Sequence, residues 1–466
     1  MAGDDAAGAG DQREAAHRIQ RGVATRNGSD SEVACGCRRR GCGGGAVKIA
    51  VLGAGIVGVA AAHALAERGH EVHVYDRRTD IASDTSASTA GLVAPGHSYA
   101  WASPKAPAML VKSLLGESTS IRVRPRADTD LVRWGFRFIR ECTPSRSRAN
   151  TLAKLRLARY SQQLMDELAA REGLQYWQTH TGVLYLFHEE ADLRTAEHNS
   201  RLLAEHGRRQ DVLDYEQTMA LEPALAHGQR RFAGAIHDTS DGTGDPHQFA
   251  IGLAAVCQRL GATFHLGTSV TRLDTDGSSI TRIMTSDGPI HADAAVLAAG
   301  SASPLLTRTM GHHIPVYPAK GYTLTATIKD PDRAPRIGGI DERSLVAWSR
   351  FGGELRMSAT AEFVGYDRSS TPADYADIID AGNELFPGAI DWDTARYRTG
   401  LRPMTPDGPP LIGLGRHDNL YYNTGHGHVG WTMACGSARM LADLIDERRP
   451  DIDPTPYSPI NRNRHR

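Results

Sequence analysis

The feature that most constrains the fold is a glycine-rich turn that follows a short apolar run near the beginning of the chain. Residues 47–52 are largely β-branched or apolar and suit a buried parallel strand. The motif Gly53-Ala54-Gly55-Ile56-Val57-Gly58 comes next, and the stretch after it predicts a helix that ends at Gly69. A second strand is expected over residues 71–75, followed directly by Asp76.

Each glycine of this motif has a mechanical reason. Gly53 permits a tight turn, Gly55 lets the backbone approach a pyrophosphate, and Gly58 lets the helix pack closely on the strand. The helix N-terminus offers free N–H groups to phosphates, and Asp76, 18 residues after Gly58, suits ribose hydroxyls. The arrangement predicts dinucleotide binding, but NAD and FAD share it.

Composition narrows the class of protein further. The 466 residues suffice for two or three domains, and 40% hydrophobic with 23% charged residues is typical of a globular protein. A net charge of −1 gives no general attraction to nucleic acid, so no such partner is expected. No apolar run approaches the ~18–20 residues of a membrane span, and no signal peptide is recognisable. We expect a cytoplasmic protein, with peripheral contact to the inner face of the cytoplasmic membrane left open.

The first 45 residues are rich in Gly, Ala, Arg and Asp and have no periodicity, so a disordered extension is expected there. Three cysteines, Cys35, Cys37 and Cys42, crowd into this stretch. Three thiols without a fourth ligand at finger-like spacing do not make a zinc site, and no metal site is predicted.

The rest of the chain alternates between helical and strand-like patterns. Apolar spacing predicts helices over residues 130–141, 151–171, 249–260 and 429–446. Strands are expected over residues 182–187, 263–266, 294–298, 322–328 and 355–359. Nucleotide-binding pieces are therefore scattered along the chain, which indicates two interleaved domains.

Four further blocks make a resemblance specific. They are residues 85–96 (TSASTAGLVAPG), 316–322 (VYPAKGY), 401–408 (LRPMTPDG) and 423–437 (NTGHGHVGWTMACGS). Together with the glycine motif they resemble the D-amino-acid dehydrogenase small-subunit family, within the D-amino-acid oxidase and glycine oxidase superfamily. The resemblance spans nearly all of the chain after residue 46.

The resemblance implies FAD as the cofactor and an α/β fold. A Rossmann-type FAD-binding domain (residues 46–105, 231–315 and 400–466) is expected to interleave with an α+β substrate domain built on an antiparallel sheet (residues 106–230 and 316–399). The positions that match the family's cofactor-binding segments are Gly53, Ala54, Gly55, Ile56, Val57, Gly58, Asp76, Arg77, Ser86, Ala90, Gly91, Leu92, Val270, Ala299, Gly300, Gly425, Gly427, Val429, Gly430, Trp431 and Thr432. Leu92 departs from the family because a polar side chain is expected there, which leaves a backbone contact in place of one hydrogen bond.

Three side chains are assigned to the substrate site. Arg402 is similar to the arginine that grips the substrate carboxylate in related oxidases, and its planar guanidinium suits that task; a surface or ion-paired arginine is the alternative. Tyr322 is either a pocket wall or carboxylate partner, or a core tyrosine with a satisfied hydroxyl. His426 is interpreted as a neighbour of the flavin, and not as a metal ligand with His428.

By this resemblance, the protein is an oxidoreductase acting on CH–NH2 donors. A D-amino acid would lose hydride from its α carbon to flavin N5, and the imine would hydrolyse to a 2-oxo acid and ammonia. Electrons would pass to a quinone or another acceptor. The alternatives are a D-hydroxyproline or D-proline dehydrogenase, a glycine or sarcosine oxidase of the same fold, and an FAD-carrying electron-relay subunit. The oligomeric state is left open.

Overall fold

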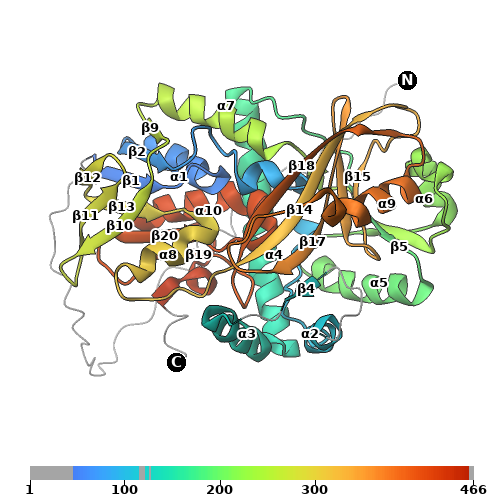
Figure 1. The fold of residues 1–466 in the computed structure, drawn as a ribbon, viewed down its shortest axis with the longest axis horizontal. Helices are drawn as coiled ribbons and strands as arrows, with labels where there is room; N and C mark the ends of the chain where they lie inside the picture. Colours follow the sequence, from blue (N-terminus) through green and yellow to red (C-terminus); the bar gives the residue numbers. More distant parts are fainter. Residues whose placement is uncertain (1–45, 115–120, 125–126, 461–466) are drawn as a thin grey trace, which may run out of the picture. The chain divides into compact units, whose positions relative to one another are not determined.

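The computed structural model describes residues 46–114, 121–124 and 127–460, and a six-stranded sheet holds its N-terminal strand (Figure 1). The strand order is β19-β20-β13-β1-β2-β9, and all neighbours pair in parallel except β19 and β20. The strands are β1 (Lys48–Leu52), β2 (Glu71–Asp76), β9 (Thr263–Leu266), β13 (Ala294–Leu297), β19 (Leu411–Leu414) and β20 (Leu420–Thr424). The extension expected over residues 1–45, with its three cysteines, lies outside the described residues.

Alternation along β1 explains why this sheet is covered on both faces. Ile49 and Val51 point to one side, where they pack on three helices, whereas Ala50 and Leu52 point to the other. The helices are α1 (Ile56–Ala66), α7 (Pro246–Arg259) and α10 (Gly430–Ile445). The opposite face is covered by a three-stranded sheet and a short helix: β10 (Val270–Thr275), β11 (Ile280–Thr285), β12 (Gly288–Ile290) and α8 (Ser303–Arg308).

A second, nine-stranded sheet forms the other half of the molecule (Figure 1). Its order is β18-β14-β17-β16-β15-β5-β7-β6, with β4 paired to β17, and most pairs are antiparallel. The strands are β4 (Ile121–Val123), β5 (Val183–Phe187), β6 (Asp211–Asp214), β7 (Gly234–Asp238), β14 (Tyr317–Ile328), β15 (Gly338–Asp341), β16 (Val346–Phe351), β17 (Glu354–Phe363) and β18 (Ile390–Met404). A two-stranded ladder of β3 (Leu92–Val93) and β8 (Gly242–Thr243) completes the strands of the described chain.

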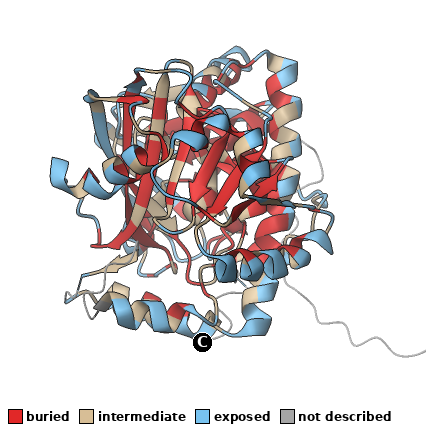
Figure 2. Ribbon diagram, turned by 90° about the vertical axis from the view of Figure 1, so that its right-hand side faces the viewer, coloured by how far each residue is buried: buried red, intermediate tan, exposed pale blue. Residues whose placement is uncertain are grey.

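The remaining helices lie around these sheets. They are α2 (Ala106–Leu114), α3 (Thr129–Glu141), α4 (Pro144–Glu172), α5 (Glu190–Ala204), α6 (Tyr215–Leu221) and α9 (Ala376–Leu385). The long helix α4 packs along α10 so closely that a Cβ on Gly436 would lie 3.0 Å from the backbone N of Ser161. Figure 2 shows buried residues concentrated in the strands, while the outer helices carry the exposed ones.

The predicted fold class is confirmed: a parallel Rossmann-type sheet is combined with an antiparallel one. Several element boundaries differ from expectation. Strand β14 begins at Tyr317 and not at residue 322, β17 runs to Phe363 and not to residue 359, and α7 begins at Pro246 and not at residue 249. Helix α1 ends at Ala66, and Gly69, with φ +84°, lies in the turn after it. Helix α4 begins at Pro144, before the expected residue 151, because proline is well placed in the first turn of a helix.

The chain passes between the two sheets several times, as interleaved domains require. Strand β7 of the large sheet lies within residues 231–315, and β18 runs across residue 400. The described residues form one compact unit. Within the described residues, no helix is both long and apolar enough to cross a bilayer.

Candidate active site

The glycine turn after β1 is shaped by contacts that leave no space for side chains. Gly53 has φ +117°, and a Cβ there would lie 2.6 Å from the carbonyl oxygen of Ala298. A Cβ on Gly58 would lie 1.9 Å from the oxygen of Gly53, so α1 packs against the turn itself. No side chain caps the N-terminus of α1 at Gly55, although the N–H of Ile56 donates to Ser86 Oγ at 3.0 Å. The turn therefore presents backbone donors to a neighbouring anion.

Asp76 ends β2 beside this turn. One carboxylate oxygen accepts from the N–H of Ala54 at 2.7 Å, and the other accepts from the N–H of Arg78 at 2.8 Å. Each oxygen keeps a lone pair for a further donor. Asp76 thus lies where a carboxylate can bind ribose hydroxyls, as its place in the sequence predicts.

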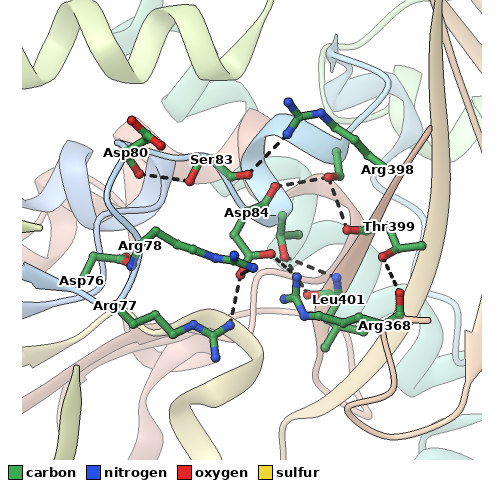
Figure 3. Close-up of polar contacts among 12 residues, drawn as sticks. Asp76, Arg77, Arg78, Asp80, Ser83, Asp84, Arg368, Arg398, Thr399 and Leu401 are labelled. Atoms are coloured by element: carbon green, nitrogen blue, oxygen red, sulfur yellow. Dashed lines mark hydrogen bonds and ion pairs between the residues drawn. The ribbon is translucent and has the colours of Figure 1, made fainter. Parts of the chain in front are cut away.

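Arg77 and Arg78 converge on a second carboxylate, Asp84 (Figure 3). Arg77 Nη2 lies 3.1 Å from Asp84 Oδ2, Arg78 Nη2 lies 3.5 Å from it, and Arg368 donates to Oδ1. Burial opposes ionisation of Asp84, but the hydrogen bond from Arg368 and the other arginines outweigh it and lower its pKa. Arg77, predicted to contact the cofactor, lines the cavity with its guanidinium paired to Asp84.

The segment after Asp84 joins the two halves of the molecule (Figure 3). It forms a short 3-10 helix, Thr85–Ser88, which lies against β18. Thr85 Oγ1 lies 3.3 Å from both the N and the O of Leu401, and Ser88 Oγ lies 3.4 Å from the carbonyl oxygen of Thr399. The cofactor-binding segment is therefore attached to the strand that carries Arg402.

A cavity of about 1490 Å³ runs between the two halves. Most of the residues predicted to bind the cofactor line it: Gly53, Gly55, Ile56, Val57, Asp76, Arg77, Ser86, Ala90, Gly91, Leu92, Val270, Ala299, Gly300, Gly427, Val429, Gly430, Trp431 and Thr432. Ala54, Gly58 and Gly425 support this wall from behind. A Cβ on Gly425 would lie 2.7 Å from Thr405 Cγ2.

The N-terminus of α10 closes one side of the cavity. After β20 the chain turns at Gly425 (φ +79°), passes through the 3-10 turn Gly427–Val429, and enters α10 at Gly430 without a side-chain cap. Thr432 Oγ1 accepts from the N–H of Ala94 at 3.2 Å, which ties α10 to the segment after β3. The helix N-terminus favours negative charge in the adjoining space.

Arg402 is one of several cationic residues that line the cavity, and it lies on β18. Its Nη1 donates to the carbonyl oxygen of Thr360 at 2.6 Å, and among the described residues no carboxylate forms an ion pair with it. Burial lowers the pKa of Arg402 to about 10, so the guanidinium stays protonated at neutral pH. Gly321 makes room for it, because a Cβ there would lie 2.6 Å from Arg402 Cζ. The guanidinium is positioned for an anionic ligand.

Tyr322 lies on the other face of β14, away from the cavity. Its hydroxyl donates to Glu362 Oε2 at 2.6 Å, and its ring packs edge-on against Tyr375 with centroids 5.4 Å apart. Side chains alternate along a strand, so Tyr322 must point away from the cavity if Gly321 faces it. This geometry corresponds to the core-tyrosine alternative, and a pocket-wall or carboxylate-partner role for Tyr322 is not supported by it.

His426 and His428 occupy different environments in the turn before α10. His426 lines the cavity, its Nε2 lacks a hydrogen-bond partner among the described residues, and burial lowers its pKa to about 3. His428 stacks on Trp101 with ring centroids 5.0 Å apart, and its Nε2 lies 3.4 Å from Lys154 Nζ. Both imidazoles are therefore neutral, and within the described chain no group of three or more His, Cys, Asp or Glu side chains is placed to hold a metal.

Sequence reasoning missed several side chains around His428. His97 lies edge-on to the His428 ring at 6.0 Å and stacks on Tyr185 at 5.5 Å. Lys154 lies behind His428, and its Nζ donates to the carbonyl oxygen of Tyr99 at 2.9 Å. We call Trp101, His428, His97 and Tyr185 the aromatic cluster. Lys154, a lysine within the helix predicted over residues 151–171, is a sequence signal that could have pointed to this cluster.

These features fit a dinucleotide cofactor. The turn at Gly53 is a cradle that a Cβ would fill, the N-termini of α1 and α10 lack side-chain caps, and Asp76 retains acceptor capacity. The cavity is long enough to be lined from the first glycine turn to α10. Backbone donors at one end and a ribose-binding acid beside them match a pyrophosphate and its sugar.

Comparison with known proteins agrees with this site. The chain matches the FAD-dependent oxidoreductase (DAO) family over residues 48–444 and belongs to that family, whose cofactor is FAD. It is 46% identical to D-amino acid dehydrogenase 2 of Mesorhizobium japonicum over 88% of this chain and 98% of that protein. It is 41% identical to the D-amino acid dehydrogenase of Chromohalobacter salexigens, with the same coverage.

Solved structures show the same fold. Glycine oxidase from Geobacillus kaustophilus superposes with a TM-score of 0.68 at 22% identity, covering 88% of this chain and 98% of that one. The L-proline dehydrogenase from P. horikoshii gives 0.68 at 20% identity, covering 90% and 98%. The chain is thus an FAD-dependent oxidoreductase.

Proposed function

We propose that this chain oxidises D-amino acids to 2-oxo acids and ammonia, with Arg402 holding the substrate carboxylate. The observation that carries the proposal is the guanidinium of Arg402, which lines the cavity and has a carbonyl oxygen as its hydrogen-bond partner. A buried cation without a counter-ion is costly, and a bidentate carboxylate ligand would complete it. The assignment of the D series is supported by the named relatives, which are 40–46% identical.

The other side chains of the wall fit this reaction. FAD, when bound, supplies the two-electron oxidation of the Cα–N bond. His426 and His428 are neutral, so they do not repel a protonated substrate amine. The main task of the cavity wall is then to orient the substrate. The glycines and the helix N-terminus at residues 425–430 would hold the flavin end of the cofactor.

The division of labour between the two halves is part of the proposal. Residues 46–105, 231–315 and 400–466 would bind FAD, and residues 106–230 and 316–399 would bind the substrate. Arg402 lies on β18, the strand that crosses between these ranges. Its register opposite Ala319 places the guanidinium beside Gly321 and at the boundary between the two halves.

The test is anaerobic reduction of the bound flavin. Purified protein should be yellow, and D-alanine should bleach its visible bands whereas L-alanine should not. D-proline, glycine and sarcosine, added separately, decide whether a cyclic or unbranched amine is the better substrate. A yellow protein that no amine bleaches would contradict the enzyme and favour the electron-relay subunit, and a colourless protein that FAD does not restore would overturn the cofactor assignment.

We also propose that the electrons go to a quinone or a similar carrier, and that this cytoplasmic protein touches the inner face of the membrane. Support comes from α2 and α3, which share one apolar cluster and expose large apolar side chains on their outer faces. Val132 is 69% exposed and Phe136 67% exposed, with Arg133 and Arg140 exposed beside them. Apolar side chains flanked by cations suit an anionic lipid surface.

Co-sedimentation with vesicles tests this contact. The protein should bind phosphatidylglycerol-containing vesicles, and the double variant V132S/F136S should bind several-fold less. Leu260→Ser is a matched control, since Leu260 is 44% exposed at the end of α7, away from α2 and α3 (Figure 1). Equal binding of all three proteins would contradict the assigned surface.

A further inference from the structure

A carboxyl group without a hydrogen-bond partner lines the same cavity beyond the aromatic cluster. Glu342 follows β15 directly, and its side chain is 24% exposed, facing the cavity. The nearest cationic candidate is His97, whose Nδ1 lies 3.9 Å from Glu342 Oε1. Burial lowers the pKa of His97 to about 4, so this imidazole is neutral and is not a counter-ion.

Tyr99 lines the same cavity, and burial together with the charge of Glu342 raises the pKa of its hydroxyl. Other groups around Glu342 are already engaged. Asp341 accepts from His188 at 2.8 Å and from Ser344 at 2.5 Å, and Arg343 is 3.9 Å from Glu384. The hydroxyl of Tyr185 donates to Asp241 at 2.7 Å. Within the described residues, no group donates a hydrogen bond to the carboxyl of Glu342. Burial and the neighbouring charge of Asp341 raise its pKa to about 7.

The aromatic cluster connects Glu342 to Arg402. His97 contacts Glu342 at one end and the ring of His428 at the other. Burial lowers the pKa of His428, and the positive charges of Lys154 and Arg402 lower it further, so the guanidinium lies within electrostatic range of that ring. Lys154 is buried behind His428 and does not line the cavity, and its own pKa is lowered to about 7. One cavity therefore offers a cation at Arg402 and an acid at Glu342.

From this arrangement we infer that Glu342 is the side-chain subsite of the enzyme and selects D-amino acids with a cationic side chain, such as D-lysine or D-arginine. The inference rests on the proposed function, because the α-carboxylate must first be held by Arg402. A substrate ammonium or guanidinium would then supply the partner that the protein does not give to Glu342. An acidic side chain, as in D-glutamate, would be repelled from the same place.

D-lysine and D-norleucine make the sharpest comparison, since the two side chains have the same length up to the charged amine. The measured quantity is the ratio of their kcat/KM values with an artificial electron acceptor. We expect the wild type to favour D-lysine and E342Q to lower the ratio by about 10- to 100-fold, the worth of a hydrogen bond to a charged group. Glu354→Gln is the matched control, because Glu354 pairs with Arg396 at the surface and its loss should leave the ratio within twofold.

A pH profile gives a second, independent readout on the wild type. The D-lysine to D-norleucine ratio should rise from pH 6 to pH 8, as the carboxyl loses its proton, while the lysine side chain stays charged. The α-amino groups of the two substrates titrate alike and cancel in the ratio. Because Lys154 also loses its charge near pH 7, we expect at most a small rise in the E342Q ratio, and the rise in the wild type should exceed it several-fold. If E342Q does not retain flavin, the wild-type profile decides.

The outcomes separate the two proposals. If D-norleucine bleaches the flavin and D-lysine is no better at any pH, the subsite is wrong and the proposed function stands. An equal loss for both substrates in E342Q would mean a structural role for Glu342 and would also overturn the subsite. If neither amino acid bleaches the flavin but D-alanine does, the subsite is again wrong and the proposed function stands. If no D-amino acid bleaches the flavin, both proposals fail.

Discussion

The two ends of the cavity are built on different principles. At the nucleotide end, groups that would contact the cofactor are backbone atoms or side chains that already have protein partners, such as Asp76, held by two N–H groups. At the substrate end, Arg402 and Glu342 have no charged partner among the described residues, and the imidazoles of the aromatic cluster are neutral. The nucleotide end is therefore held in place by protein contacts alone, whereas the charged groups at the substrate end gain their partners when a ligand binds. Substitutions should therefore act on cofactor retention at one end and on substrate selection at the other.

The largest effect is expected at the nucleotide end, from Gly53→Ala. The new Cβ would lie 2.6 Å from the oxygen of Ala298 on a backbone with φ +117°, so the turn must shift. We expect purified protein with at least tenfold less bound flavin, measured by its absorbance. Gly69→Ala is the control, since φ there is +84° but nothing lies within 4 Å of the new Cβ. It should cost about 1–2 kcal/mol of stability and keep its flavin.

Arg402→Ala tests the substrate end. Removing one partner of a buried charge pair costs about 3–5 kcal/mol, so kcat/KM for D-alanine should fall by roughly 10²- to 10⁴-fold, while flavin content stays near that of the wild type. The kcat/KM of Arg402→Lys should lie between those of the wild type and of Arg402→Ala, since an ammonium lacks the planar fork of a guanidinium. Arg396→Ala, exposed on the same strand, is the control. A similar loss in both alanine variants would contradict the carboxylate-binding role.

Lys154 makes the substrate end sensitive to pH. Burial lowers its pKa to about 7 in the folded protein, below the ordinary lysine value. At a pH between these two pKa values, Lys154 is protonated in the unfolded chain but neutral in the folded protein. The stability of the wild type relative to Lys154→Met should therefore rise with pH from 7 to 10, by on the order of 3 kcal/mol. Urea unfolding at pH 7 and pH 10 measures it. Lys48→Met, at an exposed site, should show little change, and a difference that is constant with pH would contradict the burial of an ionisable Lys154.

The smallest effect is expected where the two ends are joined, at Asp84. Asp84→Asn weakens three arginine contacts at a partly exposed site and should lower the free energy of unfolding by about 1–2 kcal/mol. Because the folded-state pKa of Asp84 is lowered, this contribution is present at neutral pH and is lost as the pH falls through that lowered value. Thermal unfolding at pH 7 and at pH 3 checks it. Asp393→Asn, at an exposed site, should stay within 0.5 kcal/mol of the wild type at both.

The same contrast explains what could be predicted from the sequence. The nucleotide end comes from contiguous segments whose strand, turn and helix are dictated locally, so Gly53, Gly58 and Asp76 were found by their spacing alone. The substrate end is assembled from segments far apart in the chain. His97 and Glu342 carry no local pattern that sets them apart, and only the tertiary structure brings the 3-10 turn Pro95–His97 next to the end of β15.

Arg402 and Tyr322 illustrate, in opposite ways, the limit of what the sequence alone can predict about the substrate site. Arg402 was found through resemblance, because no spacing rule marks an arginine on a long strand as a ligand-binding one. Tyr322 was assigned to either the pocket or the core, and the alternation of β14 would have decided between them had the cavity face of the strand been known. Gly321 faces the cavity, so its neighbour lies in the core.

The contact between Gly321 and Arg402 has a consequence for which residue position 321 can hold. The guanidinium occupies the volume that any larger residue at position 321 would need. A mutation of Gly321 to any larger residue would displace the guanidinium of Arg402. In the ladder of β14 and β18, Gly321 pairs with Gly400 and Arg402 with Ala319, so the two residues lie diagonally across the strands. The place of the guanidinium therefore depends on the absence of a side chain at position 321.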